Sequence, residues 1–210
     1  SYMALVPIIQ PPVIKAVTTK QERKIKMLYR AGDVSQTAKI IFPVVITVIA
    51  GLIAPVSLPL VGFLMFGNIL RECGVLNSLS VSAQNELVNL VSIVLGLAVS
   101  VKMQYQEFLQ IDTLIVIALG LVAFVMDTAG GVFFAKILNI FRKDKVNPMI
   151  GACGISAFPM SSRVVQKIAT EEDKSNFILM QAAGSNVSGQ IASVIAGGLV
   201  LSLVQGFLGM

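Results

Sequence analysis

Long apolar runs separated by short polar links dominate the sequence. Residues 40–70, 87–103, 111–141 and 176–210 each approach or exceed the roughly 20 residues that a helix needs to cross a bilayer. The first run carries no charge but contains Pro55 and Pro59, which predict a spanning helix to about Ala54 and then a shorter hairpin or re-entrant piece. We therefore predict an all-α polytopic membrane protein, with residues 1–210 forming a single membrane domain.

Two links between the apolar runs are basic. Residues 18–37 belong to the most basic part of the chain, and Arg142-Lys-Asp-Lys145 forms the second link. Because short cytoplasmic loops of membrane proteins are enriched in Lys and Arg, we expect both links to be cytoplasmic. An amphipathic helix on the membrane surface is the alternative for residues 18–37. Two or four crossings between the links both satisfy this orientation.

The first residues are apolar and rich in proline. Gln10-Pro11-Pro12 interrupts the run 4–17, and two consecutive prolines predict that a helix bends or ends there. No basic segment or small-residue cleavage site precedes the run, so it is not a signal peptide. The chain opens directly into an apolar stretch, as if cut inside a transmembrane element, so we expect part of the functional protein to be missing.

Composition agrees with a membrane protein and excludes several kinds of chemistry. Hydrophobic residues make up 55% of the chain, charged residues 13%, and the mean hydropathy is +0.83. The chain has no His, which excludes Ser-His-Asp and Cys-His nucleophilic sites. The net charge of +5 is best explained by membrane orientation, so we expect no nucleic-acid partner.

Residues 147–163 depart from a plain spanning pattern. Pro148, Gly151 and Pro159 interrupt an apolar run and predict a broken helix. Irregular backbone at membrane depth is tolerated only where protein or a water-filled cavity covers it, and transporters use such breaks to hold ions. Asn147 and Ser156 offer neutral oxygens that suit sodium. A kinked helix with a capping Asn and a packed Ser is the alternative.

Arg163 follows Ser156 by seven residues, so the two side chains would share one face of a continuous helix. An Arg that points into a cavity is a natural partner for a carboxylate, through its planar guanidinium group. The alternative is an Arg that snorkels to the interface at the helix end, near Lys167.

Two polar residues lie inside the later apolar runs. Asn186 needs a buried partner, which is either an ion or a neighbouring helix. Asp127 is an intramembrane acid, and such acids are functional candidates; pairing with Lys136 or capping of a kink at Gly130 are the alternatives. Small residues around Asn186 recur every four positions and predict close helix packing: Ser185, Gly189, Ser193 and Gly197.

Three ordered motifs resemble the beta subunit of the sodium-pumping, biotin-dependent decarboxylases that act on oxaloacetate, methylmalonyl-CoA or glutaconyl-CoA. They are Ser1-Tyr-Met-Ala-Leu-Val-Pro-Ile-Ile-Gln-Pro-Pro12, the segment from Asn147 to Arg163, and Gly184-Ser-Asn-Val-Ser-Gly189. The family's last motif usually reads Gly-Pro-Asn-Val-Ala-Gly, so Ser185 and Ser188 depart from it.

The resemblance implies a mechanism and a set of residues. The family's beta subunit decarboxylates carboxybiotin, consumes a proton and drives sodium outward. By position, the resemblance assigns catalysis to Tyr2, Ser156 and Arg163, with Arg163 also facing carboxybiotin. It assigns sodium to Asn147, Ser156 and Asn186, and a structural role in the broken segment to Gly151, beside Pro148 and Pro159.

The resemblance also implies partners. The implied cofactors are sodium and a biotin carried by a partner subunit. The implied partners are a soluble carboxyltransferase subunit, a biotin carrier domain, a small membrane subunit and the missing N-terminal half of the same subunit. We expect the complex to be oligomeric. An essential Asp-Gly motif upstream of the tyrosine is absent here, so we expect the fragment alone to be inactive.

The family fold resembles inverted-repeat transporters with a discontinuous helix, of which this chain would form half, in the bacterial or archaeal cytoplasmic (inner) membrane. Two alternatives remain open. The chain could be half of a sodium-coupled secondary transporter for an organic anion, or a non-catalytic membrane anchor subunit.

Overall fold

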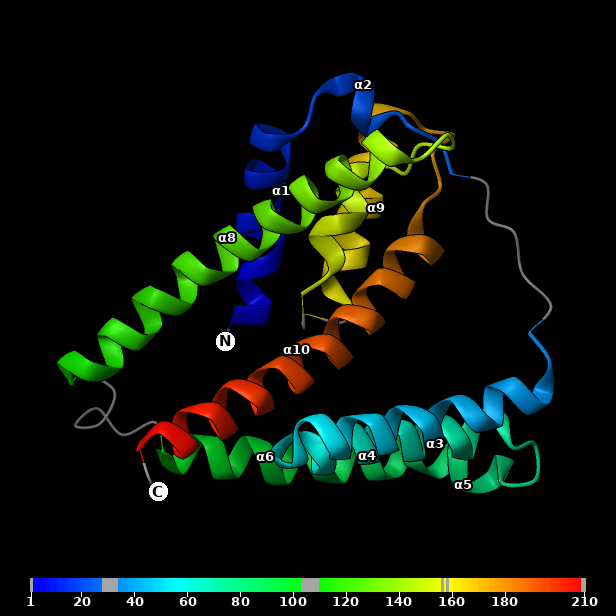
Figure 1. Ribbon diagram of the computed structural model, residues 1–210, viewed down its shortest axis with the longest axis vertical. Helices are drawn as coiled ribbons and strands as arrows, with labels where there is room; N and C mark the ends of the chain where they lie inside the picture. Colours follow the sequence, from blue (N-terminus) through cyan, green and yellow to red (C-terminus); the bar gives the residue numbers. More distant parts are fainter. Residues whose placement is uncertain (1, 28–33, 103–109, 156, 158, 209–210) are drawn as a thin grey trace. The chain divides into compact units, whose positions relative to one another are not determined.

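The computed structural model describes residues 2–27, 34–102, 110–155, 157 and 159–208, without the side chains of residues 2–4 and 102 (Figure 1). The described residues contain helices and no strand. The elements are α1 (Tyr2–Val17), α2 (Lys20–Arg23), α3 (Gln36–Ile53), the 3-10 helix η1 (Pro55–Ser57), α4 (Leu58–Glu72), α5 (Asn77–Ser82), a π-helical segment (Ala83–Leu87), α6 (Val88–Lys102), α8 (Ile111–Phe141), the 3-10 helix η3 (Pro148–Cys153), α9 (Met160–Glu172) and α10 (Leu179–Leu208).

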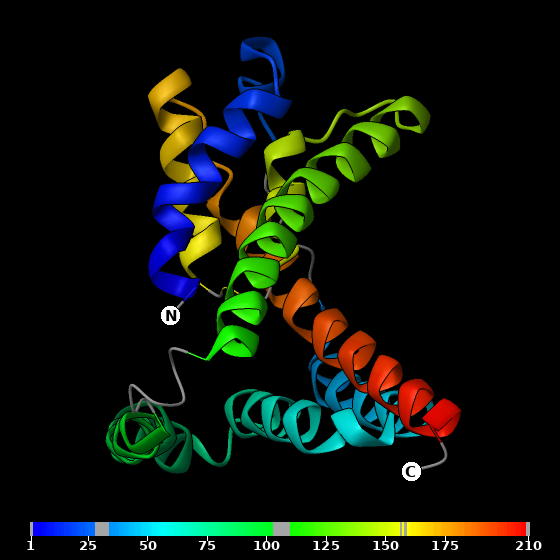
Figure 2. The same ribbon diagram turned by 90° about the vertical axis from the view of Figure 1, so that its left-hand side faces the viewer.

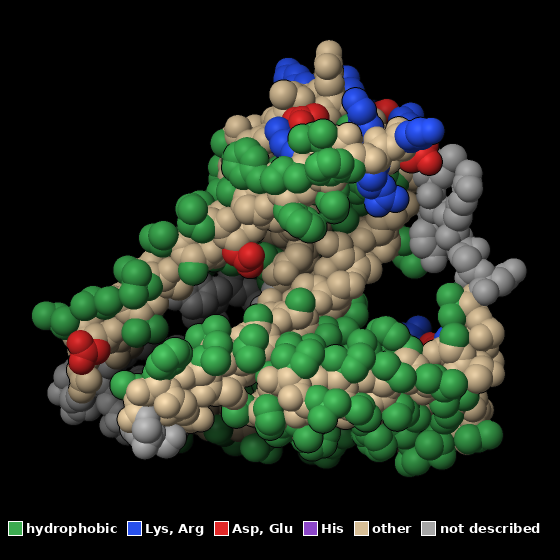
Figure 3. All heavy atoms as spheres, in the orientation of Figure 1, with side chains coloured by type: hydrophobic (Ala, Val, Ile, Leu, Met, Phe, Trp, Pro, Cys, Tyr) green, Lys and Arg blue, Asp and Glu red, His purple; other side chains and the backbone are tan. Residues whose placement is uncertain are grey.

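Four helical stretches of the described chain are long and apolar enough to cross a membrane. They are Gln36–Ile53, Asn77–Val101, Ile111–Phe141 and Leu179–Leu208. Little of their surface is buried within the chain, and hydrophobic side chains cover much of the visible face in Figure 3. An apolar surface of this extent is stable only in lipid or against other apolar surfaces. The protein is therefore an all-α, multi-pass membrane protein, as the apolar runs predicted.

The chain divides into two compact units, and the second comprises residues 32–117 and 194–210. Its centre is a helical hairpin of α3 and α4, which lie side by side (Figure 1). The turn is fixed by Pro55 at the start of η1 and by a 2.7 Å hydrogen bond that the Ser57 hydroxyl donates to the carbonyl of Ala54. The expected interruption at Pro55 is thus confirmed.

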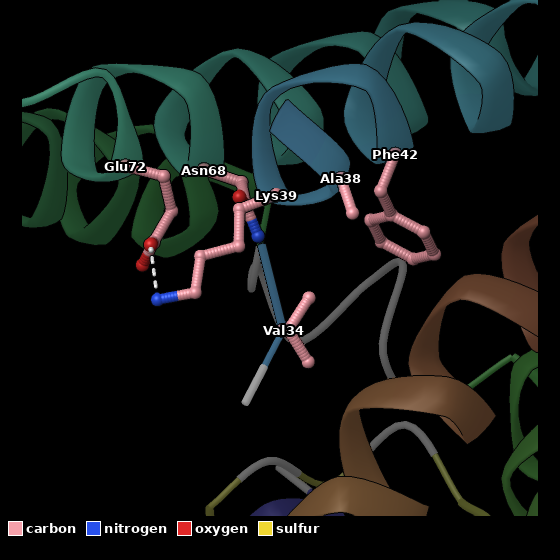
Figure 4. A pocket seen from close by; sticks show the side chains of 6 residues that line it. All are labelled: Val34, Ala38, Lys39, Phe42, Asn68 and Glu72. Atoms are coloured by element: carbon pink, nitrogen blue, oxygen red, sulfur yellow. Dashed lines mark ion pairs between the residues drawn. The ribbon is translucent and has the colours of Figure 1, made fainter. Parts of the chain in front are cut away.

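A pocket of about 390 Å³ lies at the other end of this hairpin (Figure 4). Lys39, near the start of α3, forms a 3.4 Å ion pair with Glu72, the last residue of α4. Both side chains are partly exposed, so the pair contributes little to stability and mainly sets which helix ends meet. The pocket is otherwise lined by apolar groups and one amide, from Val34, Ala38, Phe42 and Asn68.

The first unit comprises residues 1–31 and 118–193 and contains every described residue of the predicted site. Within it, α1 packs against α9, as Figures 1 and 2 both show. Contrary to one alternative of the prediction, α1 does not end at Pro11-Pro12 but is continuous to Val17. Val6, Gln10 and Ile14 recur every four residues and are all fully buried, so one packed face holds the helix together despite its lost backbone donors.

Polar contacts close the end of the first unit at which Figure 3 shows Lys and Arg gathered around α2. Thr19 and Glu22 cap α2 reciprocally. Glu22 also forms a 3.0 Å ion pair with Lys136 of α8, so the suggested pairing of Lys136 with Asp127 is not what the structure has.

The end of α8 is joined to the next segment by one amide side chain. Asn139 donates to the carbonyl of Val146 and accepts from its backbone N–H, at 2.7 and 2.8 Å. This pair of bonds ties the last turns of α8 to the link that leads into Asn147.

Candidate functional site

The helix predicted to be broken between residues 147 and 163 is interrupted. The 3-10 helix η3 ends at Cys153, the described residues between Gly154 and Pro159 are not helical, and α9 begins at Met160. Ser156 lies outside the described residues. Because α9 begins after that position, the expectation that Ser156 and Arg163 share one face of a continuous helix does not apply.

Glycine contacts fix the break between α8 and α10. A Cβ atom on Gly131 of α8 would overlap the carbonyl of Gly151, and one on Gly151 would overlap the carbonyl of Gly131. A Cβ atom on Gly189 of α10 would likewise overlap Gly154. Backbone meets backbone at both places, which only glycine permits. The small-residue face of α10 is therefore confirmed at Gly189, whereas a Cβ on Gly197 would meet no atom within 4 Å.

Asn147 is completely buried and begins η3. Its side-chain oxygen accepts from the N–H of Met149 at 3.1 Å, with Pro148 at the first helical position. Its amide group donates to the carbonyls of Arg23 and Ile25, at 3.0 and 2.9 Å. Asn147 thus ties the start of η3 to the segment that follows α2.

Asn176 completes that attachment from the link between α9 and α10. Its amide group donates to the same two carbonyls, of Arg23 at 3.1 Å and Ile25 at 3.3 Å. Its own oxygen is buried without a hydrogen-bond partner among the described residues. Two buried asparagines therefore hold one stretch of basic-loop backbone.

Asn186 acts at the opposite end of η3. It is fully buried in α10, and its amide group donates to the carbonyls of Cys153 at 3.1 Å and Ile155 at 2.6 Å. Its side-chain oxygen has no partner among the described residues. Helix-to-helix hydrogen bonding accounts for the nitrogen of Asn186 and leaves the oxygen available to a ligand.

Gln10 is a polar residue of this region that sequence reasoning missed. It is fully buried, and its amide group donates to the carbonyl of Ala152 at 2.9 Å and to the hydroxyl of Ser161 at 2.7 Å. Its oxygen also lacks a described partner. An amide in the middle of the apolar stripe between Val6 and Ile14 is the sequence signal that could have identified it.

Asn147 and Asn186 lie at different ends of η3. A 3-10 helix rises about 2 Å per residue, so Met149 and Cys153 are roughly 8 Å apart along the axis. Oxygens that bind one hard cation lie within about 5 Å of each other, since each is about 2.5 Å from the ion. The two amides therefore contact η3 at separate places, and a ligand role for Asn147 stays a prediction.

The remaining predicted residues have different surroundings. Arg163 is exposed on α9, and none of the five ion pairs among the described residues includes it. Tyr2 begins α1, but its side chain lies outside the described part. Asp127 is exposed on α8. Among the described residues, no hydrogen bond or ion pair joins the side chains of Arg163 and Asp127 to the amides at the break.

Ion pairs join the end of α9 to the segment after α1. Arg23, itself almost fully buried, pairs with Glu172 at 2.7 Å, and its hydrogen bond lowers the pKa of that carboxyl group. Hydrogen bonds from Ser175, and then Lys26 at 3.1 Å, lower the pKa of Asp173 to about 2. These carboxylates stay charged at neutral pH, so the attachment is ionic under all ordinary conditions.

The donor set at the break favours a monovalent cation. The described residues contain no group of three or more His, Cys, Asp or Glu that could hold a metal ion. What the break offers instead is neutral oxygen, from Asn186, Gln10 and the backbone around Gly154. Neutral oxygens without a carboxylate bind a singly charged hard cation better than they bind an anion or a softer metal. The orphaned oxygens therefore fit sodium.

Comparison with known proteins gives a consistent picture. The family model of the Na+-transporting oxaloacetate decarboxylase beta subunit matches residues 1–204. The oxaloacetate decarboxylase beta chain of Haemophilus ducreyi is 51% identical over 205 residues, which cover 98% of this chain and 47% of that protein.

Relatives with other substrates in their names are nearly as similar. The methylmalonyl-CoA decarboxylase subunit beta of Propionigenium modestum is 47% identical over 97% of this chain and 51% of its own length. The glutaconyl-CoA decarboxylase subunit beta of Acidaminococcus fermentans is 45% identical over 98% and 55%, respectively. The chain spans about half the length of the curated relatives it matches.

Proposed function

This chain belongs to the family of the Na+-transporting oxaloacetate decarboxylase beta subunit, and we propose that it is part of a membrane subunit that decarboxylates carboxybiotin and couples this reaction to outward sodium transport. The observation that supports the proposal best is the completely buried oxygen of Asn186, which has no hydrogen-bond partner in the described part of the chain, beside a helix break. A membrane anchor has no need of such an oxygen, because leaving a buried acceptor unpaired is costly.

Sodium binds at the break in this proposal. Asn186 supplies one neutral oxygen, and the carbonyls freed where η3 ends supply others. Ser156 is a further predicted ligand outside the described residues. Asn147 fixes the start of η3, so it supports the geometry of the break even without touching the ion.

Carboxybiotin is the second ligand, delivered on a biotin carrier by the soluble carboxyltransferase partner. Its carboxylate is an anion, and Arg163 is an exposed guanidinium group on the helix that follows the break. Tyr2 and Ser156 are the groups proposed to handle the proton that decarboxylation consumes. Release of this free energy drives transport only if sodium affinity differs between two conformations of the site.

The assembly in which this happens contains more than the present chain. We propose the soluble carboxyltransferase subunit, the biotin carrier domain, a small membrane subunit and the remainder of the beta subunit as partners, in a bacterial or archaeal cytoplasmic membrane. The acyl substrate belongs to the soluble partner, so oxaloacetate, methylmalonyl-CoA and glutaconyl-CoA are alternatives that this chain does not separate.

Sodium dependence tests the proposal directly. In the complete, membrane-embedded complex we expect decarboxylation of carboxybiotin to accelerate with sodium and to saturate, because binding of the ion is coupled to the reaction. Potassium at the same ionic strength should not replace it. The measurement is the initial rate of decarboxylation against sodium concentration. A rate indifferent to sodium over several decades of concentration would contradict the pump and leave the anchor as the better interpretation.

Arg163→Lys separates carboxylate binding from sodium binding. The substitution keeps the charge but removes the planar group that binds a carboxylate through two parallel hydrogen bonds. We expect turnover to fall about tenfold or more, with an unchanged half-saturating sodium concentration and no rescue by added sodium. The maximal rate and the half-saturating sodium concentration, both taken from the sodium titration, check this prediction. An Arg that merely snorkels to the interface predicts wild-type turnover instead.

A further inference from the structure

We propose that Gln10 is a ligand of the transported sodium ion and that it shares this ion with Asn186 across the helix break. The inference rests on the proposed function, because it assumes that the ion at the break is the transported one. It goes beyond that proposal by assigning a ligand role to Gln10 of α1, a residue to which the resemblance to the family assigned no role.

The first argument is the position of Gln10. Val6, Gln10 and Ile14 form the buried stripe of α1, and each is completely inaccessible. An amide in such a stripe is expensive unless all of its polar atoms are bonded. An aliphatic residue would fill this position without that cost, so packing alone does not account for a glutamine.

The second argument is how its two polar atoms are used. The nitrogen of Gln10 donates both hydrogens, to the carbonyl of Ala152 and to the hydroxyl of Ser161. This fixes the orientation of the amide group and places Oε1 on its other side, where it is buried and has no partner among the described residues. A flipped amide would set its oxygen against the carbonyl of Ala152, which is repulsive.

The third argument is that Asn186 repeats the arrangement on the same short segment. Its nitrogen donates to the carbonyls of Cys153 and Ile155, one and three positions beyond the carbonyl held by Gln10. Its oxygen is also buried and has no partner within the described ranges of the chain. The oxygen and nitrogen of an amide are only roughly 2.2 Å apart, so both orphaned oxygens stay close to the backbone of 152–155.

The chemistry of the ligand follows from these atoms. The N–H bonds of both amide groups are already used in hydrogen bonds. The atoms that remain are the two oxygens, which can only accept. Acceptors alone repel an anion and attract a cation, and the absence of a carboxylate from the described partners favours a single positive charge. A buried water could also satisfy such oxygens, and it is the competing occupant that the experiment must separate from sodium.

The experiment uses the complete complex and replaces sodium by potassium at constant ionic strength. Two quantities are measured: the sodium concentration that half-saturates decarboxylation, and the sodium-dependent rise of the thermal unfolding midpoint, which reports binding without turnover. Gln10→Met keeps the length of the side chain but removes the oxygen. We expect it to raise the half-saturating sodium concentration about tenfold or more and to shrink the thermal shift accordingly.

Ser161→Ala is the matched control. Ser161 accepts the bond from Gln10 and donates to the carbonyl of Ala152 at 3.2 Å, so its removal disturbs the same network without deleting an orphaned oxygen. It should lower the unfolding midpoint equally in sodium and in potassium and reduce sodium affinity far less than Gln10→Met does, because the bond to the carbonyl of Ala152 still orients the amide group. If Gln10→Met behaves in this way too, Gln10 is a packing residue or binds water, and the inference is overturned.

Two further variants keep the test decisive. Gln10→Glu keeps an oxygen and adds a titratable group, so sodium affinity should rise with pH as the buried carboxyl group ionises if position 10 touches the ion. The same sodium affinity at every pH contradicts the inference even if Gln10→Met fails to fold. The double variant Gln10→Met/Asn186→Leu should lose less affinity than the product of the single losses, because ligands of one ion are coupled. Independent, multiplying losses would contradict a shared ion.

The failure of this inference is distinguishable from failure of the proposed function. If Asn186→Leu weakens sodium binding and Gln10→Met does not, the pump assignment stands and only the role of Gln10 is wrong. If the unsubstituted complex shows neither a sodium-dependent rate nor a thermal shift specific to sodium, the proposed function itself is wrong.

Discussion

Substitution of Gly131 by alanine should destabilise the first unit by about 2 kcal/mol or more, because the new methyl group would overlap the carbonyl of Gly151. Both partners are backbone atoms, so no side chain can rotate to make room. The two segments must separate, which also distorts the break that carries the proposed sodium site. We expect a lower thermal unfolding midpoint of the complex and a large loss of sodium-dependent decarboxylation.

Gly130→Ala is the matched control for this prediction. It places the same methyl group one residue earlier in α8, where a Cβ atom meets nothing within 4 Å. Alanine is the better helix former by up to about 1 kcal/mol, so this variant should be as stable as the natural chain or slightly more stable. Equal unfolding midpoints for the two variants would show that α8 and η3 are not in backbone contact.

Asn186→Leu and Asn147→Leu should fail in different ways. Asn186→Leu removes an oxygen that has no hydrogen-bond partner among the residues described at the break, so sodium affinity should fall about ten- to a hundredfold, corresponding to about 1–3 kcal/mol. Because mass action refills a weakened site, high sodium should partly restore the rate. The titration of decarboxylation rate against sodium measures both effects.

Asn147→Leu removes a cap and two long-range hydrogen bonds, to the carbonyls of Arg23 and Ile25. It leaves the N–H of Met149 unpaired in a buried position, which costs about 1–3 kcal/mol. We therefore expect a lower unfolding midpoint in sodium and potassium alike, with little rescue of activity by sodium. Rescue as complete as for Asn186→Leu would make Asn147 a direct ligand after all.

Hydrophobic patterning was enough to predict the main helices. The apolar runs beginning at residues 111 and 176 correspond to α8 and α10, because a helix that crosses lipid must satisfy its own backbone and expose apolar side chains. Pro55 likewise marked the turn between α3 and α4. These features depend on local composition and need no knowledge of neighbours in space.

The polar interior was harder to predict because its partners are distant in the sequence. Asn147 was correctly identified as a helix start from the following proline, a local signal, but its bonds to residues more than 120 positions away left no trace in the pattern. The same holds for Gln10, which appeared only as an interruption before two prolines. Its partners are residues 142 and 151 positions away.

One of the two expectations for Pro11-Pro12, that the helix ends there, was wrong because tertiary packing compensated for the prolines. Pro11 and Pro12 each remove a backbone donor, and a helix was expected to bend or end there. The structure continues α1 to Val17, because the buried stripe through Ile14 packs on α9 and stabilises the helical path. A local propensity was outweighed by burial of one face.

The glycine contacts of the break have a consequence for how this region moves. Side chains that pack together can accommodate a displacement gradually, by changing rotamers one after another. Gly131 against Gly151, and Gly189 against Gly154, offer no such adjustment. A shift of η3 must therefore either carry α8 and α10 with it or break the backbone contacts with them completely. A segment with only two arrangements lets an ion site be either open or closed, with few intermediate states through which an ion can leak.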